Sequence, residues 1–346
     1  NIYIVFSNII YIKKRMNSNK LAVGLPIAFC IFLSLFIFIS AFQGSSSSYT
    51  SDNKFDSFSQ GSANSTSFTK RFIGGIHAIG QYISGVISGR FGILDEETAT
   101  IFSCGNLTSS NTVYTLNNSV NSSGTCFNIL ANSITLNCNS SIINYSQSVN
   151  GYGVANNGYN YTAVKNCNIT QGSSTRTSSY ALYFQNGVNA TILDNVISIY
   201  GSTTATNVWN HDIFFANNKN NTISGNTLST RGRDSYSIYL SNSANNTLRL
   251  NNISTHATGG YGIYILGAGS DGNNLTLNNL TIYGSATRGI VLSTNTLHNL
   301  ISSNKIIIVN NSLSHGINLL SNSRNNNVSF NVINMLGSSA RAVYVQ

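Results

Sequence analysis

Charged residues and proline are scarce in this 346-residue chain: Asp, Glu, Lys and Arg make up 8% of it, and there is one proline. A coiled coil or helical bundle needs charged flanks beside its apolar seam, so the low charge argues against both. A disordered chain is excluded too, because 41% of the residues are hydrophobic. Asn, Ser, Thr and 29 glycines supply the polar and turn-forming positions, which favours strands joined by turns. We therefore expect an all-β fold.

Acidic residues are especially few beyond residue 104, where four aspartates (Asp194, Asp212, Asp234, Asp271) stand against ten basic residues. The positive charge is scattered singly and forms no basic stripe. Diffuse charge supports only weak contact with polyanions, so we expect no nucleic-acid partner. The five histidines are dispersed and no carboxylate-rich loop of calcium type occurs. We therefore expect no metal and no cofactor.

One long apolar segment, residues 21–42, contains no charged side chain. At 1.5 Å per helical residue it is long enough to cross a bilayer core of about 30 Å. Basic residues precede it, which predicts that residues 1–20 stay in the cytoplasm, unless part of them lies upstream of a translation start at Met16. We expect a single-pass membrane anchor with an extracellular C-terminal domain; a cleaved signal sequence would make the protein secreted.

Two segments separate this anchor from the repeats described below. Residues 43–71 are rich in Ser, Asn and Gly with almost no aliphatic side chains, so we expect a flexible stalk. Ile76, Ile79 and later aliphatic residues recur at three- and four-residue spacing, which predicts an amphipathic helix at about 72–90. We favour a capping role for it, with residues 72–103 as cap and lead-in. The alternative is that this helix lies in the membrane interface. That role is less favoured, because several glycines weaken the helix.

From about residue 112 the chain repeats an apolar-x-apolar triplet. The series begins at Val154 and ends at Val343, and its seven steps average 27 residues. The triplets between these ends are Leu182 and Phe184, Ile213 and Phe215, Ile238 and Leu240, Ile263 and Ile265, Ile290 and Leu292, and Ile317 and Leu319.

A second stripe has the form apolar-x-x-Asn-x-apolar and the same mean period of about 27 residues. In Val164, Cys167 and Ile169 a cysteine takes the place of the Asn. The Asn of the later repeats are Asn195, Asn226, Asn251, Asn278, Asn304 and Asn331. Two stripes with one period indicate a solenoid.

Each repeat is expected to hold two short strands that can bury their apolar faces only against the matching strands of neighbouring coils. Stacked coils place parallel strands about 4.8 Å apart, and the recurrent Asn would form a ladder from coil to coil. A left-handed β-helix is excluded because its hexapeptide repeat gives multiples of six. A leucine-rich repeat has an overlapping period, but it would not contain the second strand stripe and is the less favoured alternative.

Segments such as NNTISGNTL (220–228) and YGIYIL (261–266) resemble the right-handed parallel β-helix repeats of the pectate-lyase-like and NosD-like superfamily. Residues 103–138 are similar to the first coils of exported archaeal β-helix proteins. The resemblance covers 104–346 and implies a right-handed parallel β-helix solenoid with coils of about 27 residues. It implies little about activity, because many unrelated functions use this architecture. The last stripe reaches residue 346 without a cap, which suggests a truncated β-helix.

Four cysteines remain when Cys30, inside the apolar segment, is set aside. Export permits disulfides, and four cysteines allow three pairings. Cys104 and Cys126 are 22 residues apart, and Cys138 and Cys167 are 29 apart, so both spacings approximate one coil. We predict the bridges Cys104–Cys126 and Cys138–Cys167. Four separate buried thiols are the alternative.

Enzymes of this superfamily that act on acidic polysaccharides generally use a cluster of carboxylates, sometimes holding calcium, with an Arg or Lys base. Here only Asp212 and Asp234 come near each other in the repeat, one coil apart, with His211, Arg231 and Arg233 around them. Two carboxylates and a base could serve acid/base catalysis. We favour the simpler interpretation, an exposed ion pair between Asp and Arg on adjacent coils.

Polygalacturonase-like enzymes combine four motifs, of which this chain shows only the fragment Ser314-His315-Gly316. His315 occupies a repeat position whose other members are Tyr180, His211, Tyr236, Tyr261, Arg288 and Arg341. The coil pattern therefore explains its place without catalysis, and we name no catalytic residue.

An outward position lies between the two buried residues of each apolar triplet. In successive coils it holds Tyr183, Phe214, Tyr239 and Tyr264, followed by Val291, Asn318 and Tyr344. The four aromatic rings could stack on sugars along a glycan or stack on one another to shield the sheet; the two roles are compatible, and we favour shielding. Sequons at Asn220, Asn245 and Asn274 suggest N-glycosylation.

These observations predict a cell-surface β-helix that acts in adhesion, envelope structure or glycan binding. Its partners would be the membrane, through residues 21–42, and an extracellular glycan or envelope component. A polysaccharide lyase, hydrolase or epimerase is the alternative, which the small number of carboxylates disfavours. A fibre-forming subunit is a third hypothesis, if open coil ends stack; the sequence does not indicate an oligomeric state.

Overall fold

The computed structural model describes residues 96–173, 175, 177–201, 209–256, 258–309, 313–336 and 340–346. These residues form three parallel sheets of 10, 9 and 10 strands, so the chain is an all-β right-handed parallel β-helix. The predicted anchor, stalk and amphipathic helix lie outside the described residues. Among the residues that are described, no helix has the length and apolar character needed to span a membrane.

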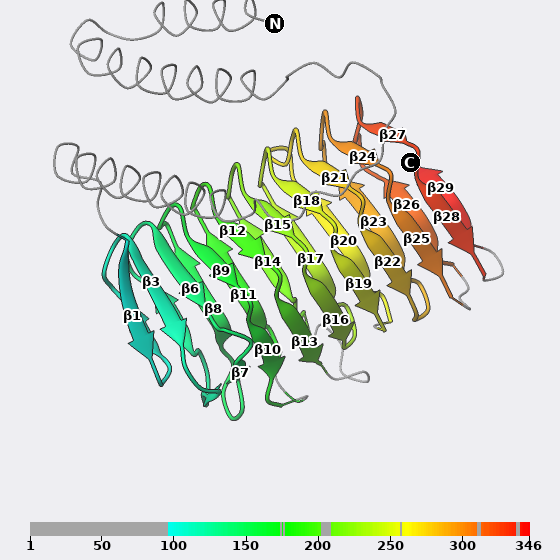
Figure 1. Ribbon diagram of the computed structural model, residues 1–346. Helices are drawn as coiled ribbons and strands as arrows, with labels where there is room; N and C mark the ends of the chain where they lie inside the picture. The colour runs from blue at the N-terminus through cyan, green and yellow to red at the C-terminus, as the bar shows by residue number, and fades with distance from the viewer. Residues whose placement is uncertain are drawn as a thin grey trace, which may run out of the picture. The chain divides into compact units, whose positions relative to one another are not determined.

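The strands of each sheet come from successive coils and stack along one axis (Figure 1). Sheet A contains β1 (Glu97–Ile101), β3 (Thr112–Leu116), β6 (Ile134–Asn137), β9 (Ala163–Lys165), β12 (Thr191–Leu193), β15 (Thr222–Ser224), β18 (Thr247–Arg249), β21 (Asn274–Thr276), β24 (Leu300–Ser302) and β27 (Asn327–Ser329). Sheet B contains β2 (Gly105–Leu107), β5 (Phe127–Ile129), β8 (Tyr152–Asn157), β11 (Tyr180–Gln185), β14 (Ile213–Ala216), β17 (Tyr236–Ser241), β20 (Tyr261–Leu266), β23 (Arg288–Ser293), β26 (His315–Leu319) and β29 (Arg341–Val345). Sheet C contains β4 (Val120–Asn121), β7 (Ile142–Tyr145), β10 (Asn168–Gln171), β13 (Val196–Tyr200), β16 (Thr227–Arg231), β19 (Asn252–Thr255), β22 (Asn279–Ile282), β25 (Lys305–Ile308) and β28 (Val332–Met335).

Each regular coil has three strands, in the order A, C, B, and the prediction of two strands per coil was wrong. The motif apolar-x-x-Asn-x-apolar spans two strands: Ile223 belongs to β15, Leu228 to β16, and Asn226 stands at the corner between them. The residue before the Asn has a left-handed backbone, as in Gly225 (φ +68) and Leu250 (φ 56). This conformation turns the chain from sheet A into sheet C.

The core is a continuous apolar lumen enclosed by the three sheets. One residue from each sheet illustrates this: Ile223 of sheet A, Leu228 of sheet C and Ile238 of sheet B. None of the three side chains has exposed surface. Equivalent residues pair in register from coil to coil, as Ile238 does with Ile263. Burial of this kind is the main stabilising contribution, because no coil can cover its own apolar side chains.

The predicted Asn ladder runs through the corner between sheets A and C. Asn251 is representative: its Oδ1 accepts from Asn226 Nδ2 (3.0 Å), and its Nδ2 donates to Asn278 Oδ1 (2.9 Å) and to the carbonyl of Ile223 (2.9 Å). Side-chain bonds of the same kind connect Asn195 continuously to Asn331. A buried amide with every polar group paired stabilises the corner, whereas an unpaired one would destabilise it.

A second Asn ladder, which the sequence analysis missed, occupies the corner between sheets B and A. It consists of Asn221, Asn246, Asn273, Asn299 and Asn326, joined by Nδ2-to-Oδ1 bonds of 2.7 to 3.0 Å. In the sequence each of these residues comes two positions before the apolar residue of the sheet A strand. Two of the three corners therefore carry a side-chain ladder.

Both predicted disulfides are present in the first coils. Cys104 is bonded to Cys126, with Cα atoms 4.6 Å apart, and Cys138 to Cys167, with Cα atoms 4.7 Å apart. The β-helix also begins earlier than residue 104, because β1 starts at Glu97 and pairs with β3.

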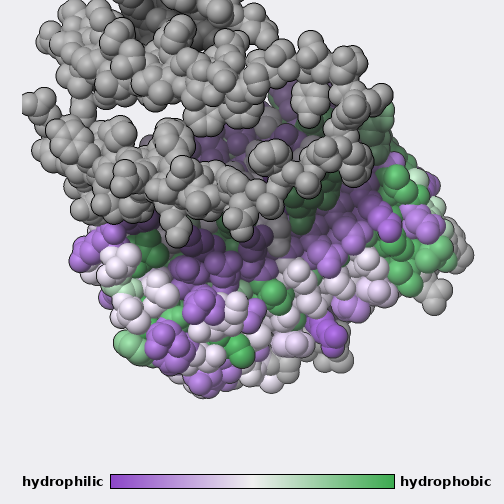
Figure 2. Space-filling model, in the orientation of Figure 1, coloured by the Kyte–Doolittle hydropathy of each residue, from purple (hydrophilic) through white to green (hydrophobic). Residues whose placement is uncertain are grey.

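The surface of the coils is mostly hydrophilic or intermediate on the side shown in Figure 2, with apolar colour towards the C-terminal end. In the last coil Val343 and Val345 continue the lumen positions of Ile317 and Leu319, and they are 46% and 66% exposed because no described coil packs on them.

Candidate functional site

Near the start of the sheet B strands from β8 to β26, two consecutive residues are buried, while the strands still pair one-to-one with their neighbours. We call this break in the alternation the bulge, and it leaves two outward columns of side chains on sheet B. In β17, Ser237 and Ile238 are both buried, so Tyr236 and Tyr239 lie three residues apart and both remain on the outer face. The first buried position favours small residues: a Cβ on Gly262 would lie 2.7 Å from both Leu280 Cδ2 and Gly289 O. Two buried residues in succession break the two-residue alternation of a regular strand.

We call the surface formed by these outward columns the aromatic face. Its first column comprises Tyr152, Tyr180, His211, Tyr236 and Tyr261. Its second column comprises Tyr183, Phe214, Tyr239 and Tyr264, the four residues predicted from the sequence, which pair in register across β11, β14, β17 and β20. The first column was recognised as a repeat position but not as part of a site, although its aromatic residues were visible.

The rings of the first column stack on one another. His211 lies between Tyr180 and Tyr236, with ring centroids 5.0 and 4.9 Å away and interplanar angles of 4° and 9°. Burial lowers the pKa of His211 to about 3, and burial together with neighbouring tyrosines raises the pKa of Tyr180 to about 12. These shifts keep His211 and Tyr180 uncharged at neutral pH, and the rings of the column cover one another as the shielding interpretation requires.

The second column has a different ring geometry in β17 and β20. Tyr239 and Tyr264 are 5.1 Å apart and nearly parallel to each other. The ring plane of Tyr239 lies at 90° to that of its first-column neighbour Tyr236. The ring plane of Tyr264 lies at 82° to that of Tyr261. Tyr239 and Tyr264 are both partly exposed. These two rings do not continue the stack of the first column and are the best placed to contact a ligand.

Beyond Tyr261 and Tyr264 the two columns continue with different chemistry. The first column position is taken by Arg288, His315 and Arg341, and the second by Val291, Asn318 and Tyr344. The outer face of sheet B is thus aromatic along β11 to β20 and basic along β23 to β29.

Asp212 and Asp234 do not form the surface patch that the sequence suggested. Asp212 takes the first buried position of the bulge, faces the lumen and has no exposed surface; its Oδ2 accepts from Thr230 Oγ1 at 2.5 Å. Burial raises its pKa well above the usual range, with hydrogen bonds to Thr230 and Ser237 lowering it in part. Asp234 is paired instead with Arg233, with 3.7 Å between Nε and Oδ2.

The expected ion pair between Asp and Arg on adjacent coils is therefore wrong, and the disfavoured acid/base pair does not form either, for one physical reason. In a regular strand Asp212 would point outward, because it directly precedes the inward-facing Ile213. The bulge turns Asp212 into the lumen instead. His211 is buried in the ring stack, and Arg231 lies over the ring of Tyr200 at 5.7 Å. The described residues bring no two carboxylates together at this surface.

The predicted glycosylation sites fall at two kinds of position. Asn220 and Asn245 are exposed in the turns that enter sheet A and have left-handed backbones. Asn274 lies within β21, is partly buried, and its Oδ1 has no hydrogen-bond partner. The first two are accessible to a modifying enzyme, and glycosylation of all three stays a prediction.

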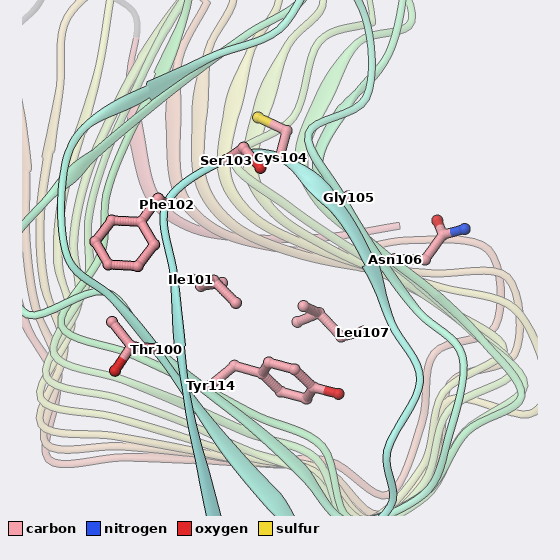
Figure 3. Close-up of a pocket in the computed structure, with 9 residues that line it drawn as sticks. All are labelled: Thr100, Ile101, Phe102, Ser103, Cys104, Gly105, Asn106, Leu107 and Tyr114. Carbon is pink, nitrogen blue, oxygen red and sulfur yellow. The ribbon is translucent and has the colours of Figure 1, made fainter.

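A cavity of about 340 Å³ opens at the first coil. Figure 3 shows Ile101, Leu107 and Tyr114 directed into it, while Asn106 points away. The hydroxyl of Tyr114 accepts hydrogen bonds from the backbone of Ser109 (2.9 Å) and Thr108 (3.2 Å). The cavity is the end of the apolar lumen and holds no cluster of polar side chains. No group of three or more His, Cys, Asp or Glu side chains anywhere in the described part of the chain could hold a metal ion.

Comparison with known proteins adds no family. No protein-family model matches this chain, and no curated protein does. Among solved structures, the Dettilon tailspike protein is 12% identical with a TM-score of 0.38, covering 72% of this chain and 61% of that one. The A-module of the mannuronan C-5 epimerase of Azotobacter vinelandii is 13% identical with a TM-score of 0.23, covering 70% of this chain and 88% of that one. This chain thus spans about three fifths of the tailspike chain, and neither likeness carries an argument about activity.

Proposed function

We propose that the β-helix binds a glycan along the aromatic face and does not cleave it. The observation that carries the proposal is the second column, in which four successive coils each present an aromatic ring. Neighbouring ring centroids are 5.0 to 5.5 Å apart, from Tyr183 through Phe214 and Tyr239 to Tyr264. A glycan lying along the helix axis would meet a new ring with each coil, and its apolar sugar faces would pack on those rings.

The charge state of the face supports a neutral or weakly acidic ligand. His211 is held neutral by burial, which lowers its pKa, and burial raises the pKa of Tyr239 and Tyr264. The face therefore offers apolar rings and neutral hydroxyl groups, a combination suited to sugars. Binding by rings alone requires no titrating group, whereas hydrolysis or elimination needs an acid or base near the scissile bond.

A role in adhesion or in attachment to the cell envelope follows from the same binding if residues 21–42 anchor the chain in the cell membrane. The glycan would then belong to the envelope or to another cell, and the β-helix would present its aromatic face outside. The two disulfides support this placement, because disulfides persist mainly in oxidising compartments.

The test is the double variant Tyr239→Ala/Tyr264→Ala in the full-length chain, measured on neutral gluco-, manno- and galacto-hexaoses. We expect affinity to fall by about tenfold or more, because each ring contact contributes roughly 1 kcal/mol. Tyr200→Ala/Tyr283→Ala is the matched control, since both tyrosines are partly exposed outside sheet B (43% and 37%). If Tyr239→Ala/Tyr264→Ala binds the oligosaccharides with unchanged affinity, the second column only shields the sheet and does not bind a glycan.

Turnover is measured on the same oligosaccharides. We expect neither new reducing ends nor unsaturated products. Product formation that Asp212→Asn or Asp234→Asn abolishes would favour the enzyme hypothesis and contradict ours.

A further inference from the structure

The basic continuation of the aromatic face brings three nitrogen-bearing side chains together on adjacent coils. Arg288, His315 and Arg341 pair in register across β23, β26 and β29. Burial lowers the pKa of His315, and the charges of Arg288 and Arg341 lower it further, as expected for two guanidinium groups beside the ring.

No carboxylate neutralises this cluster among the described residues. Their one side-chain ion pair joins Arg233 and Asp234, two coils away from Arg288. Asp271 is the single acidic residue beyond residue 260, and its Oδ1 accepts from the backbone of Leu297 at the corner between sheets B and A. Nδ1 of His315 is buried and has no hydrogen-bond partner. The charge of the two arginines is therefore not compensated by a neighbouring acid.

The arginines are held in place along the surface. Nη1 of Arg288 donates to the hydroxyl of Tyr261 and to the carbonyl of Ala286, both at 3.2 Å. The side-chain amide of Asn318 pairs both of its polar atoms when its oxygen faces Arg288. In that orientation the oxygen accepts a hydrogen bond from Arg288 Nε at 2.8 Å. The guanidinium of Arg341 lies over the ring of Tyr344 at 4.6 Å. Fixed guanidinium groups lose little freedom on binding and suit the planar oxygens of an anion.

We propose that Arg288, His315 and Arg341 form a subsite for an anionic group, a carboxylate or a sulfate, at one end of the glycan whose neutral sugars lie on the aromatic face. The inference rests on the proposed function, because the subsite continues the same two columns. It adds a direction: the anionic end of the ligand points towards the C-terminal coils, and the neutral part extends over Tyr264 and Tyr239.

The experiment compares three forms of each hexaose on the full-length chain: neutral, with one terminal carboxylate, and with one terminal sulfate. We expect at least one acidic form to bind about tenfold tighter than its neutral parent, the effect of one charge-assisted hydrogen bond. Arg288→Gln/Arg341→Gln should reduce that form to the affinity of its neutral parent. Lys219→Gln/Lys305→Gln removes the same charge from exposed positions outside sheet B and should keep the gain.

The outcomes separate the two proposals. Equal binding of neutral and acidic forms, or a gain that survives in Arg288→Gln/Arg341→Gln, overturns the anionic subsite while neutral binding still supports the proposed function. Arginine-dependent binding of acidic forms that is insensitive to Tyr239→Ala/Tyr264→Ala overturns the proposed function and leaves the subsite standing. The carboxylate and sulfate arms identify which anion is preferred.

Discussion

The first coils and the later coils hold their neighbours together by different means. Between residues 104 and 167 two disulfides bridge adjacent coils, Cys104–Cys126 and Cys138–Cys167. Cys138–Cys167 lies at the corner between sheets A and C, and from Asn195 to Asn331 the side chains at that corner are joined by hydrogen-bonded amides. Cys167 marks the change, because it occupies the ladder position, is bonded to Cys138, and donates its backbone N–H to Asn195 Oδ1 (3.0 Å).

The difference shows what each device requires. A disulfide joins one pair of coils and needs nothing from the next coil. A ladder needs the same residue in every coil, since each amide must both donate and accept, and a missing member removes hydrogen bonds from both of its neighbours. The ladder therefore suits the regular coils, and the disulfides suit the first ones, where the strands and their spacing vary more.

The apolar lumen is common to both regions and is expected to give the largest effect. Ile263 is fully buried, so Ile263→Ala should lower the unfolding free energy by about 2 to 5 kcal/mol. Tyr264→Ala, at the next residue on the outer face, should cost far less. Denaturant titration of both variants measures this, and similar losses would contradict the inward and outward assignment.

Loss of a covalent bridge comes next. Cys138→Ser/Cys167→Ser should lower stability by about 2 to 4 kcal/mol, because the unfolded chain gains freedom that the bridge removes. Reducing conditions open both bridges, so the unmodified protein should then lose more stability than this variant does under oxidising conditions. Free thiols at these positions in non-reducing peptide mapping would show instead that the first coils lack the covalent bridge.

Removal of one ladder amide should cost less than removal of a bridge. Asn251→Ala removes the acceptor of the Asn226 backbone N–H and one of the three acceptors of Asn226 Nδ2, which predicts a loss of about 1 to 3 kcal/mol. Asn331→Ala is the comparison within the ladder: Asn331 is the last member and only partly buried, so its loss should be smaller. Equal losses at the two positions would mean that the amides act independently of their place in the ladder.

The last prediction concerns pH. Burial raises the pKa of Asp212 above its unfolded value, so its contribution to stability is fully present below about pH 4 and is lost as the pH rises through the folded pKa. Asp212→Asn removes this titration and should gain stability relative to the unmodified protein as the pH increases from 4 to 8. His211 has a lowered pKa and contributes with the opposite sign in both proteins, so the difference between them isolates Asp212. A constant difference across this range would contradict the buried carboxyl.

The sequence predicted the parts of the fold that repeat. The 27-residue period, the lumen positions such as Ile263, the ladder through Asn251 and both cysteine pairs are recognisable because each recurs or matches one coil spacing. The third strand was not recognisable, since strands of three residues such as β15 are too short to show an alternating pattern.

The site was predicted only where the strand is regular. Tyr239 and Tyr264 lie between two buried residues of an ordinary alternation, so their outward direction could be inferred. Tyr236 and Asp212 lie at the bulge, where the alternation fails, and their directions were missed for that reason. The glycan-binding role of the aromatic face stays a prediction.

The corner between sheets C and B absorbs differences in coil length. Residues 201–212 join β13 to β14, whereas residues 232–235 join β16 to β17, yet the Asn ladder and the strand pairing pass through both coils unchanged. Inserted residues at this corner therefore do not disturb the stack. Because the corner leads directly into the aromatic face, loops inserted there would change the border of that face in one coil at a time while the scaffold stays the same. If the face binds a glycan as proposed, its ligand preference could change in this way during evolution or design.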